Sequence, residues 1–509
     1  KQSNYSMKER DNLTYPYRLN GFVNIRNEFG IISTKRHYLN GQSDYSIYYD
    51  NHGEPKEGRW FGEYENGQLS SECHYLNGKQ HGQGTYRLPN GYEYIGDWVA
   101  GEIRGSGTAR FPNGSIYEGT FVAGKPSGTG KITFADGGTF EGDWLDGNIT
   151  GRGIAAYANG VVYEGELRNA MHHGTGTMKS PGGYVYVGPW INGVKEGEGQ
   201  ITYPDGAIYA GNLKAGERDG TGTLTMADGL VYAGTWVNGQ IEGQGRLEQP
   251  NGDIYDGGLA AGRRQGTGTV TYANGDTYAG GFVDDKRHGQ GTFMGTDGYK
   301  YSGDWKAGQI EGTGEVTYPD GSVYTGTFSA DLADGMGKII YPDGSSYDGA
   351  WDNGVINGAG IATYANGLVY DGEFLNAKNH GQGKMTYADG YTYDGEWANG
   401  QRNGMGRAIY ADGTIYDGTF TDGQRDGTGK ITLPDGFTYQ GAWTGGEISG
   451  QGTATYANGD IYEGTFVRGR RQGVGTMRYT TGEEATGDWV DGTLPVAEVA
   501  PVAEPTDDN

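Results

Sequence analysis

The residues that most often carry catalysis or metal binding are scattered along this sequence. His172-His173, His288 and His380 occupy one equivalent loop region of a repeating pattern, several repeats apart, so they cannot converge on one metal ion or form a triad. Cys73 and His74 are neighbours, but adjacent residues of a strand point to opposite faces, which argues against a thiolate pair. These patterns predict a non-enzymatic protein that needs no metal and no cofactor.

Two further patterns imitate ligand sites. Glycine-rich stretches such as residues 220–223 look like phosphate-binding loops, but no helix is expected after them and they recur in every repeat. Acidic turns could suit calcium, yet the nine-residue spacing of calcium-binding β-rolls is absent. Turn geometry explains both patterns without a ligand.

The strongest pattern is aromatic and periodic. From Tyr94 to Gly492 the motif Tyr-x-Gly-x-Trp/Phe-x-x-Gly-x-x-x-Gly-x-Gly-x-x-x-Tyr-x-Asn/Asp-Gly recurs every 23 residues without insertion or deletion. This gives seventeen complete units and an eighteenth that begins at Ala485. Such a period predicts a stacked array in which each unit buries its apolar side against its neighbours.

Composition supports a repeat array over several globular domains. The chain has 509 residues with 100 glycines, 40 tyrosines and 34% hydrophobic residues, which cannot fill conventional cores. Aromatic residues make up 13%, too many for a solvated coil. No run of 18 apolar residues occurs, so the sequence predicts no transmembrane helix.

Each unit is expected to contain two strands. Residues 94–98 alternate aromatic residues and glycine with mostly polar residues, a period of two that indicates a strand. Residues 105–111 continue the alternation after a loop centred on residues 102–104. The following Asn113-Gly114 is typical of a type I′ hairpin turn, because both residues tolerate a positive φ.

Glycines inside the strands need a reason, since glycine there normally destabilises a sheet. Gly96, Gly105 and Gly107 lie on the aromatic face, so we infer that Tyr and Trp rings lie flat across bare backbone. The predicted fold class is all-β, an elongated single-layer antiparallel β-meander of stacked 23-residue β-hairpin repeats.

The pattern is similar to a known family. Residues 117–121, Tyr-Glu-Gly-Thr-Phe, with Gly124, Gly128 and Gly130, resemble the membrane occupation and recognition nexus (MORN) repeat, and the likeness covers about four fifths of the chain. Residues 65–78 resemble the shorter MORN variant of bacterial antitoxin-like repeat proteins, and residues 27–41 echo it. The resemblance implies β-hairpin stacks acting as scaffolds, dimerisers or membrane-associated spacers; it does not imply catalysis.

The predicted organisation has four parts. Residues 1–70 are an irregular N-terminal cap with degenerate variant repeats, and residues 71–93 are a transitional repeat. Residues 94–492 are the array, and residues 493–509 are a Pro/Ala/acid-rich tail expected to be disordered.

The aromatic face is the candidate interaction site. The rings could simply be core, but a single-layer sheet would leave one side of this face open as an apolar groove. An amphipathic helix or peptide, a glycan or a lipid headgroup could occupy such a groove. The candidate groove residues are Trp98, Trp144, Trp190, Trp236, Trp305, Trp351, Trp397 and Trp443.

A second period underlies the first, because tryptophan returns every 46 residues. Residues 81–98 reappear 207 residues later as residues 288–305, which indicates that nine units were copied. Nine is odd, so the alternation flips at the join. A ligand that reads alternate units should meet a register break near Leu259 to Phe282.

The loop residues alternate too. Units with Trp tend to carry an apolar residue such as Ile103, whereas units with Phe or Leu often carry a cation such as Arg218. Packing explains this, and an alternative is that the loops form a rim that pairs between copies. The basic rim candidates, expected to be solvated and with a phosphate site as the alternative, are Arg263, Arg264, Lys286, Arg287, Arg470 and Arg471.

Charge limits the partners. A net charge of −25 and a pI near 4.7 argue against nucleic acid and against broad adhesion to anionic lipid. A membrane contact stays open but has no support from charge. The expected partner is protein, in a homo-oligomer or an end-to-end assembly through open strand edges.

The expected function is that of a non-enzymatic, rod-like scaffold or assembly protein mediating protein–protein or self-association. The alternative is a monomeric binding module whose aromatic groove takes a peptide helix, glycan or lipid headgroup. The chain opens at Lys1, which fits a removed signal peptide or a shortened chain. We expect export from a bacterial cell to the periplasm or beyond, with the cytoplasm as the alternative.

Overall fold

The computed structural model describes the backbone of residues 21–26, 30, 32–39, 42–49, 55–63 and 69–495. Within that part the chain contains β-strands and no helix. Contacts group the chain into two large parts, which we call unit 1, residues 1–250 with 259–262, and unit 2, residues 251–258 with 263–509. From here on, the 23-residue units of the sequence are called repeats. Most of the predicted tail, from residue 496 onward, lies outside the described residues, as do residues 65–68 of the predicted variant repeat.

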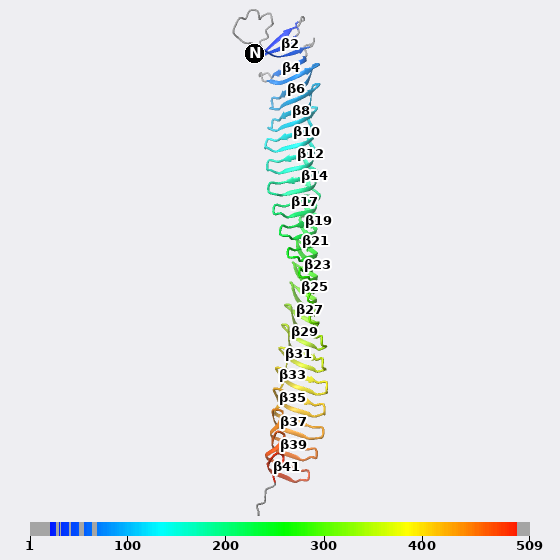
Figure 1. The fold of residues 1–509 in the computed structure, drawn as a ribbon, viewed down its shortest axis with the longest axis vertical. Coiled ribbons are helices and arrows are strands. Elements are labelled where there is room, and N and C mark those ends of the chain that lie inside the picture. Colours follow the sequence, from blue (N-terminus) through cyan, green and yellow to red (C-terminus); the bar gives the residue numbers. More distant parts are fainter. Residues whose placement is uncertain are drawn as a thin grey trace, which may run out of the picture. The chain divides into compact units, whose positions relative to one another are not determined.

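In unit 1, consecutive strands pair antiparallel, and the short β16 shares its partner β15 with β17 (Figure 1). The strands are β1 Gly21–Arg26, β2 Ile32–Leu39, β3 Gln42–Tyr49, β4 Pro55–Glu63, β5 Leu69–Leu76, β6 Lys79–Arg87, β7 Glu93–Val99, β8 Glu102–Arg110, β9 Ile116–Val122, β10 Lys125–Thr133, β11 Thr139–Leu145, β12 Asn148–Ala156, β13 Val162–Arg168, β14 Met171–Lys179, β15 Val185–Ile191, β16 Val194–Lys195, β17 Gly197–Thr202, β18 Ile208–Lys214, β19 Glu217–Thr225, β20 Val231–Val237 and β21 Gln240–Glu248.

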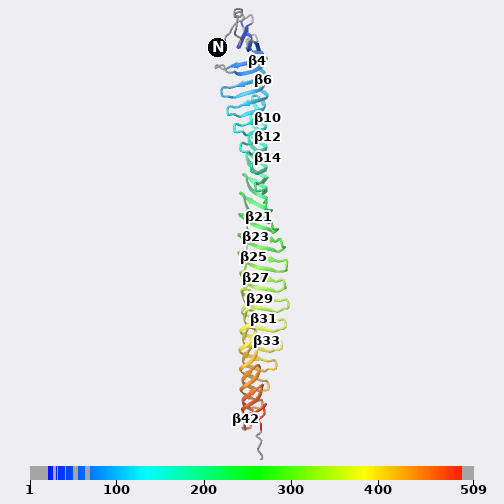
Figure 2. The same ribbon diagram turned by 60° about the vertical axis from the view of Figure 1, so that its left-hand side comes forward.

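The strand β22, Ile254–Ala260, contains residues of both units. In unit 2, consecutive strands from β23 onward again pair antiparallel (Figure 2). These strands are β23 Arg263–Thr271, β24 Thr277–Val283, β25 Lys286–Met294, β26 Lys300–Lys306, β27 Gln309–Thr317, β28 Val323–Ser329, β29 Leu332–Ile340, β30 Ser346–Asp352, β31 Val355–Thr363, β32 Val369–Leu375, β33 Lys378–Thr386, β34 Thr392–Ala398, β35 Gln401–Ile409, β36 Ile415–Thr421, β37 Gln424–Thr432, β38 Thr438–Thr444, β39 Glu447–Thr455, β40 Ile461–Val467, β41 Arg470–Arg478 and β42 Glu484–Trp489. The predicted antiparallel meander of 23-residue hairpins is therefore confirmed within each unit.

The tightest hairpin turn is not the one that the sequence predicts. Val99 pairs with Glu102 across the two residues Ala100-Gly101, which have φ angles of 55° and 92°. Two consecutive positive φ angles in a two-residue hairpin are type I′ geometry. Alanine rarely adopts a positive φ, so its recurrence at this position in several repeats hides the turn from sequence reading.

Asn113-Gly114 closes a three-residue loop instead, so the type I′ prediction for the Asx-Gly turns is wrong. The backbone N–H of Phe111 donates to the carbonyl of Ser115 at 2.8 Å, and of the two turn residues only Gly114 has a positive φ. The side-chain oxygen of Asn113 accepts from the backbone N–H of Ser115 at 3.0 Å. This is a type I turn followed by a glycine bulge, with an Asx cap.

The predicted loop at residues 102–104 is also wrong, because these residues belong to β8. Gly96 pairs with Gly107, whereas Trp98 pairs with Ile103, so the register shifts between them. The carboxylate of Asp97 accepts from the backbone N–H of Ser106 at 2.8 Å and stabilises this bulge. The bulge turns Ile103 toward the aromatic face opposite Trp98.

The core of each 23-residue repeat is one tyrosine ring over two glycines. Tyr94 is fully buried, and its hydroxyl donates to the carbonyl of Asp97 at 2.9 Å. A Cβ atom added to Gly96 or Gly107 would come within 3.0 Å of this ring. The prediction that an aromatic ring lies across bare backbone is therefore confirmed for Gly96 and Gly107, but it is wrong for Gly105, where an added Cβ would meet the side chain of Asp97.

Neighbouring repeats are joined by a ladder of edge-to-face ring contacts. The ring of Tyr94 lies 5.9 Å from the ring of Trp98 in its own repeat and 5.0 Å from the ring of Phe121 in the next repeat, with interplanar angles near 80°. The same arrangement links Tyr117 to Phe121 and Trp144. Each such contact adds about 0.5–1.5 kcal/mol of stabilisation beyond that from the burial of apolar surface area. Repeats joined in this way therefore stabilise each other.

The start of the array uses a smaller side chain in place of tyrosine. Cys73 in β5 pairs with Gly84 in β6, and a Cβ on Gly84 would lie 2.7 Å from the Cys73 sulfur. Burial raises the pKa of this thiol to about 11, which keeps it protonated. The described strands β1 to β4 of the predicted N-terminal cap pair in chain order. Antiparallel strand pairing therefore begins before the first regular repeat.

We predict that filling the space under a ring destabilises the array. Gly222→Ala would press a methyl group against the ring of Tyr209, and overpacking of this kind costs about 1–3 kcal/mol. Gly182→Ala is the matched control, because a Cβ there meets nothing within 4 Å. Urea denaturation followed by circular dichroism should show a lower midpoint for Gly222→Ala alone. Equal midpoints for the two variants would contradict the ring-over-glycine account.

We also predict a loss of stability in alkali. Burial raises the pKa of Tyr117, Tyr209 and Tyr324 to about 12, because the charged phenolate is poorly solvated in the core. The stabilisation is complete below the unfolded pKa of about 10 and is lost as pH rises toward 12. Absorbance at 295 nm and circular dichroism should therefore change together above pH 10. Titration of most tyrosines near pH 10 with unchanged circular dichroism would refute this.

Candidate interaction groove

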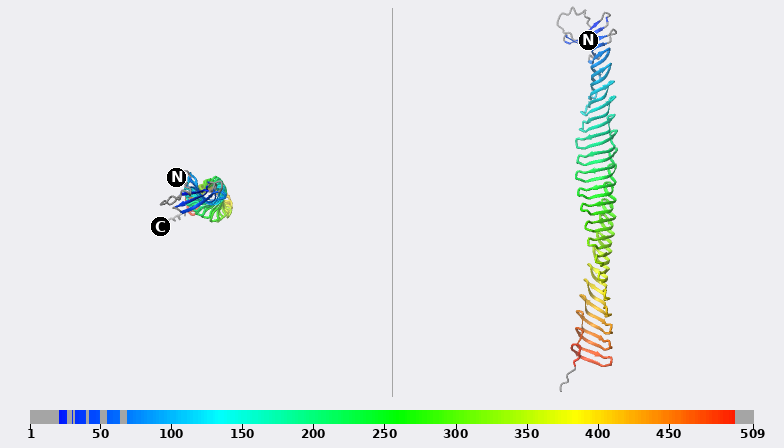
Figure 3. Two further views of the ribbon diagram at one scale, coloured as in Figure 1. Left: turned by 90° about the horizontal axis from the view of Figure 1, so that it is seen from above. Right: turned by 45° about the vertical axis from the view of Figure 1, so that its right-hand side comes forward.

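The two rows of turns flank the aromatic face in each unit (Figure 3). Between them unit 1 contains two pockets of about 410 and 390 Å³ that share Phe111 and Pro126. Because they share these residues, the pockets are neighbouring segments of one groove. In each unit, we call the depression on the aromatic face between the two rows of turns the groove.

The exposed lining of the groove comes from the third aromatic position of the repeat, at the end of the second strand. Several of these rings keep more than a third of their surface accessible. They include Phe134 at 38%, Tyr157 at 42%, Tyr341 at 36%, Tyr364 at 40%, Tyr387 at 36% and Tyr479 at 37%.

The tryptophans predicted as groove residues form its floor. All of them except the half-buried Trp351 are buried, with Trp98, Trp144, Trp190, Trp236, Trp305, Trp397 and Trp443 between 2% and 7% exposed. Most of their indole N–H groups donate to a glycine carbonyl of the preceding repeat, as Trp144 does to Gly130 at 3.2 Å. Trp98 is the exception, since its buried Nε1 has no partner. These side chains can present only ring edges to a ligand.

Cations in the groove stack on the indole rings of the following repeat. The guanidinium of Arg218 lies 4.0 Å from the centre of the Trp236 ring, and Arg425 lies 4.4 Å from Trp443. Arg218 also donates to the carbonyl of Gly239 at 3.0 Å. A cation over an aromatic face contributes about 0.5–2 kcal/mol.

This stacking explains the alternation seen in the sequence. The bulge brings the second residue after the type I′ turn onto the aromatic face, directly opposite the fifth residue of its own repeat, as Arg218 lies opposite Leu213. The same side chain also meets the ring of the next repeat. A repeat without Trp precedes a repeat with Trp, so the loop residue of the repeat without Trp is the one that reaches an indole. An arginine at that position therefore gains a cation–π contact.

The six predicted rim cations divide into two sets. Arg263, Lys286 and Arg470 are exposed at the rim, as predicted, and the first and last pair with Asp284 at 3.3 Å and Asp491 at 3.7 Å. The prediction of a solvated rim is wrong for the residues that follow them. These are Arg264, Arg287 and Arg471, which lie 5.2, 4.1 and 4.4 Å from the rings of Phe282, Trp305 and Trp489.

His172 takes the same place as these arginines. Its ring stacks on Tyr163 at 3.8 Å and meets Trp190 edge-on at 4.7 Å. A ring nitrogen lies 2.8 Å from the hydroxyl of Tyr157, and burial lowers the pKa of the imidazole. This histidine is therefore a packing residue of the groove floor.

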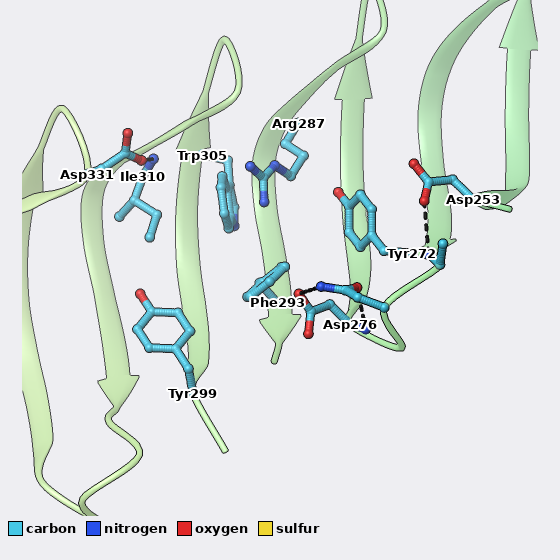
Figure 4. Close-up of a pocket in the computed structure, with 11 residues that line it drawn as sticks. Asp253, Tyr272, Asp276, Arg287, Phe293, Tyr299, Trp305, Ile310 and Asp331 are labelled. Carbon is cyan, nitrogen blue, oxygen red and sulfur yellow. Dashed lines mark hydrogen bonds between the residues drawn. The ribbon is translucent and has the colours of Figure 1, made fainter. Parts of the chain in front are cut away.

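Unit 2 contains a larger pocket of about 740 Å³ in the groove (Figure 4). Figure 4 shows the guanidinium of Arg287 directed into the space between Trp305 and Tyr272, above Phe293. Aspartates surround the aromatic part. The remaining lining residues are Asp253, Ala273, Asn274, Asp276, Tyr299, Ile310 and Asp331.

The acidic side chains of this pocket are engaged at the rim. Asp253 accepts from the backbone N–H of Ala273 at 2.9 Å, and Asp276 accepts from the backbone N–H of Thr296 at 2.9 Å. These hydrogen bonds, first that from Thr296 and then that from Asn274, lower the pKa of Asp276. Both carboxylates therefore fasten one three-residue loop to the next.

Among the residues that the structure describes, no group of three or more His, Cys, Asp or Glu side chains is placed to hold a metal ion. The described part of the chain also has no helix with the length and hydropathy needed to cross a membrane.

The pockets lie on the face that the aromatic period identifies, and their lining includes the predicted Trp144 and Trp305. The aromatic period identified the face, because the alternation of a strand is local. It could not show that neighbouring rings cover the tryptophans or that a bulge brings arginines into the groove. The partly exposed third aromatic, such as Tyr364, was visible in the repeat as a conspicuous ring beside a turn.

Several solved structures match the chain at low identity. The TCP domain of SAS-4 of Drosophila melanogaster, in complex with a proline-rich motif of Ana2, is 18% identical over 30% of this chain and 85% of that one, with a TM-score of 0.21. The wild-type TCP10 domain of Danio rerio CPAP is 15% identical over 48% and 93%, with a TM-score of 0.17. A streptogramin B lyase is 14% identical over 58% and 91%, with a TM-score of 0.11. At these scores the likeness carries no argument about function.

A search of curated proteins returns no match to the sequence. A family model does match, and it is described as the MORN repeat. Its eighteen consecutive matches begin with residues 74–91, continue with residues 94–116, and end with residues 462–484. Their borders repeat the 23-residue period and cover most of the sequence. The chain therefore belongs to the MORN repeat family.

Proposed function

We propose that this protein is a non-enzymatic scaffold that binds segments of other proteins in its groove. The observation that carries the proposal is the continuity of the groove, in which adjacent pockets share Phe111 and Pro126. A row of apolar pockets at the spacing of the repeat suits a chain that presents several apolar side chains in sequence. The buried aromatic floor is rigid, so such a segment would meet a preformed surface.

Charge favours a protein segment over a membrane surface. The net charge is −25, so an anionic lipid surface would be repelled. The exposed cations Arg263 and Arg470 are already paired with aspartates of the next turn. A glycan remains the competing occupant, because sugars also stack on exposed aromatic rings.

We predict that peptides selected on this protein bind in the groove. A displayed library of twelve-residue random peptides would be selected on the full chain, and binding of the selected peptides would be measured by fluorescence anisotropy. Phe111→Ser combined with Phe134→Ser removes apolar lining from the groove and should weaken peptides bound in unit 1 by at least about tenfold.

The matched control for this experiment lies on the opposite face of the same unit. Ile95→Ser combined with Ile154→Ser removes two side chains that are 45% and 48% exposed there, and this pair should leave binding unchanged. Failure to select any peptide, or equal loss in both double variants, would refute the groove as a protein-binding site.

Self-association is a second proposed function. Among the described residues, β42 pairs with β41 on one side only, which leaves backbone groups on its other edge for a strand of another molecule. Leu494 packs against Gly487 beside this edge, where the ladder of tyrosines has ended.

We expect the purified chain to form dimers or longer assemblies whose fraction rises with concentration. Size-exclusion chromatography with multi-angle light scattering, at several concentrations and salt levels, measures this directly. Edge pairing rests on backbone hydrogen bonds, so it should survive high salt. A monomer at every concentration would exclude self-association, and assembly that vanishes in high salt would assign it to the charged rims. Export stays a prediction from the sequence.

A further inference from the structure

Arg287 differs from the other arginines of its position in having no acceptor for its hydrogen bonds. Its guanidinium contacts the rings of Trp305 at 4.1 Å, Tyr278 at 5.6 Å and Phe293 at 5.8 Å. Among the described residues it forms no ion pair and no side-chain hydrogen bond.

The equivalent arginines are occupied. Arg218, Arg425 and Arg471 each donate to a glycine carbonyl of the next type I′ turn, at 3.0, 2.9 and 2.5 Å. Arg264 is held by Asp285, through its side chain and the carbonyl oxygen. The side chain of Arg287 is therefore the one of this set whose donors are all available, and it is directed into a pocket of about 740 Å³ (Figure 4).

The stacking fixes which kind of acceptor fits. The guanidinium lies over the ring of Trp305, with its Cζ atom 4.1 Å from the ring centre, and this contact engages none of its N–H groups in a hydrogen bond. Two parallel N–H groups of a guanidinium match the two oxygens of a carboxylate, which is also planar. The neighbouring rings of Phe293 and Tyr299 offer apolar contact to the carbons that carry such a carboxylate.

The three aspartates of the pocket restrict the charge of the ligand. Asp253, Asp276 and Asp331 each accept a backbone hydrogen bond at the border, and they leave a negative potential around the guanidinium. A dianion such as a phosphate monoester would be repelled more strongly than a monoanion. A single carboxylate on an otherwise apolar segment, with backbone N–H groups that can face the aspartates, suits the pocket best.

We propose that the pocket around Arg287 binds an acidic side chain, Glu or Asp, of a protein segment that lies along the groove with apolar residues on either side. This inference rests on the proposed function, because it names the residue that such a segment presents to unit 2. It makes Arg287 the specificity-determining residue of the groove in this unit.

The test uses the peptides selected on the full chain and three forms of the protein. The decisive variant is Arg287→Met, which keeps an unbranched side chain over the ring and removes the charge. Arg407→Met is the matched control, because Arg407 is exposed on the opposite face of the sheet in unit 2, where it pairs with Asp417 at 3.6 Å. Thermal denaturation of both variants checks that the array remains folded.

We expect peptides with Glu or Asp between apolar residues to dominate the selection for unit 2. Arg287→Met should weaken them about 10- to 100-fold, as should replacement of the peptide's Glu by Gln, and combining both changes should cost little more. Arg407→Met should leave affinity unchanged.

Other outcomes overturn the inference and separate it from the proposed function. If peptides bind the groove but Arg287→Met and Glu-to-Gln peptides behave as the parents do, the carboxylate pocket is wrong and the protein-binding groove stands. If no peptide binds the parent chain, both fail. If a trimer of galacturonate binds in an Arg287-dependent way and no peptide does, the occupant is an acidic glycan and the proposed protein segment is wrong.

Discussion

The contact between one tyrosine ring and two glycines is the interaction on which the rest of this structure depends. The ring of Tyr94 can lie on the sheet only because Gly96 and Gly107 have no side chains beneath it. It is thereby buried without a second layer of protein above it. Where the next repeat carries an aromatic residue at its fifth position, the same closeness brings the ring into edge-to-face contact with it, as Tyr94 contacts Phe121. The core and the contact between such repeats are therefore one structure.

The strands and the ring-over-glycine core could be predicted because both follow from the alternation of side chains within a few residues. The turns could not, since Ala100 adopts a positive φ that its residue type disfavours, and the preference of Asn113-Gly114 for type I′ yields to a three-residue loop. Part of the groove lining could be predicted, since Trp144 and Trp305 border its pockets. Burial of Trp305 by neighbouring rings, and the bulge that brings Arg287 over it, are tertiary consequences that no local pattern encodes.

The tryptophan alternation breaks at Phe282, where the sequence predicts the join of a nine-repeat duplication. The repeat with Phe282 follows another without tryptophan, so Arg264 meets a phenyl ring and Arg287 meets the next indole. Cations therefore stand in two consecutive repeats at this place. The pocket with the unoccupied guanidinium lies beside this break in the alternation.

The locality of these contacts also determines how such a chain can fold. Tyr94 reaches Phe121 in the adjacent repeat, and the ring contacts of the described residues extend no further than a neighbouring repeat. Little loop entropy is lost before each contact forms, so a pair of hairpins anywhere in the array can nucleate and grow in both directions. The terminal hairpins have one neighbour instead of two. They should open first, and the chain would then unfold by fraying from its ends, not in a single cooperative step.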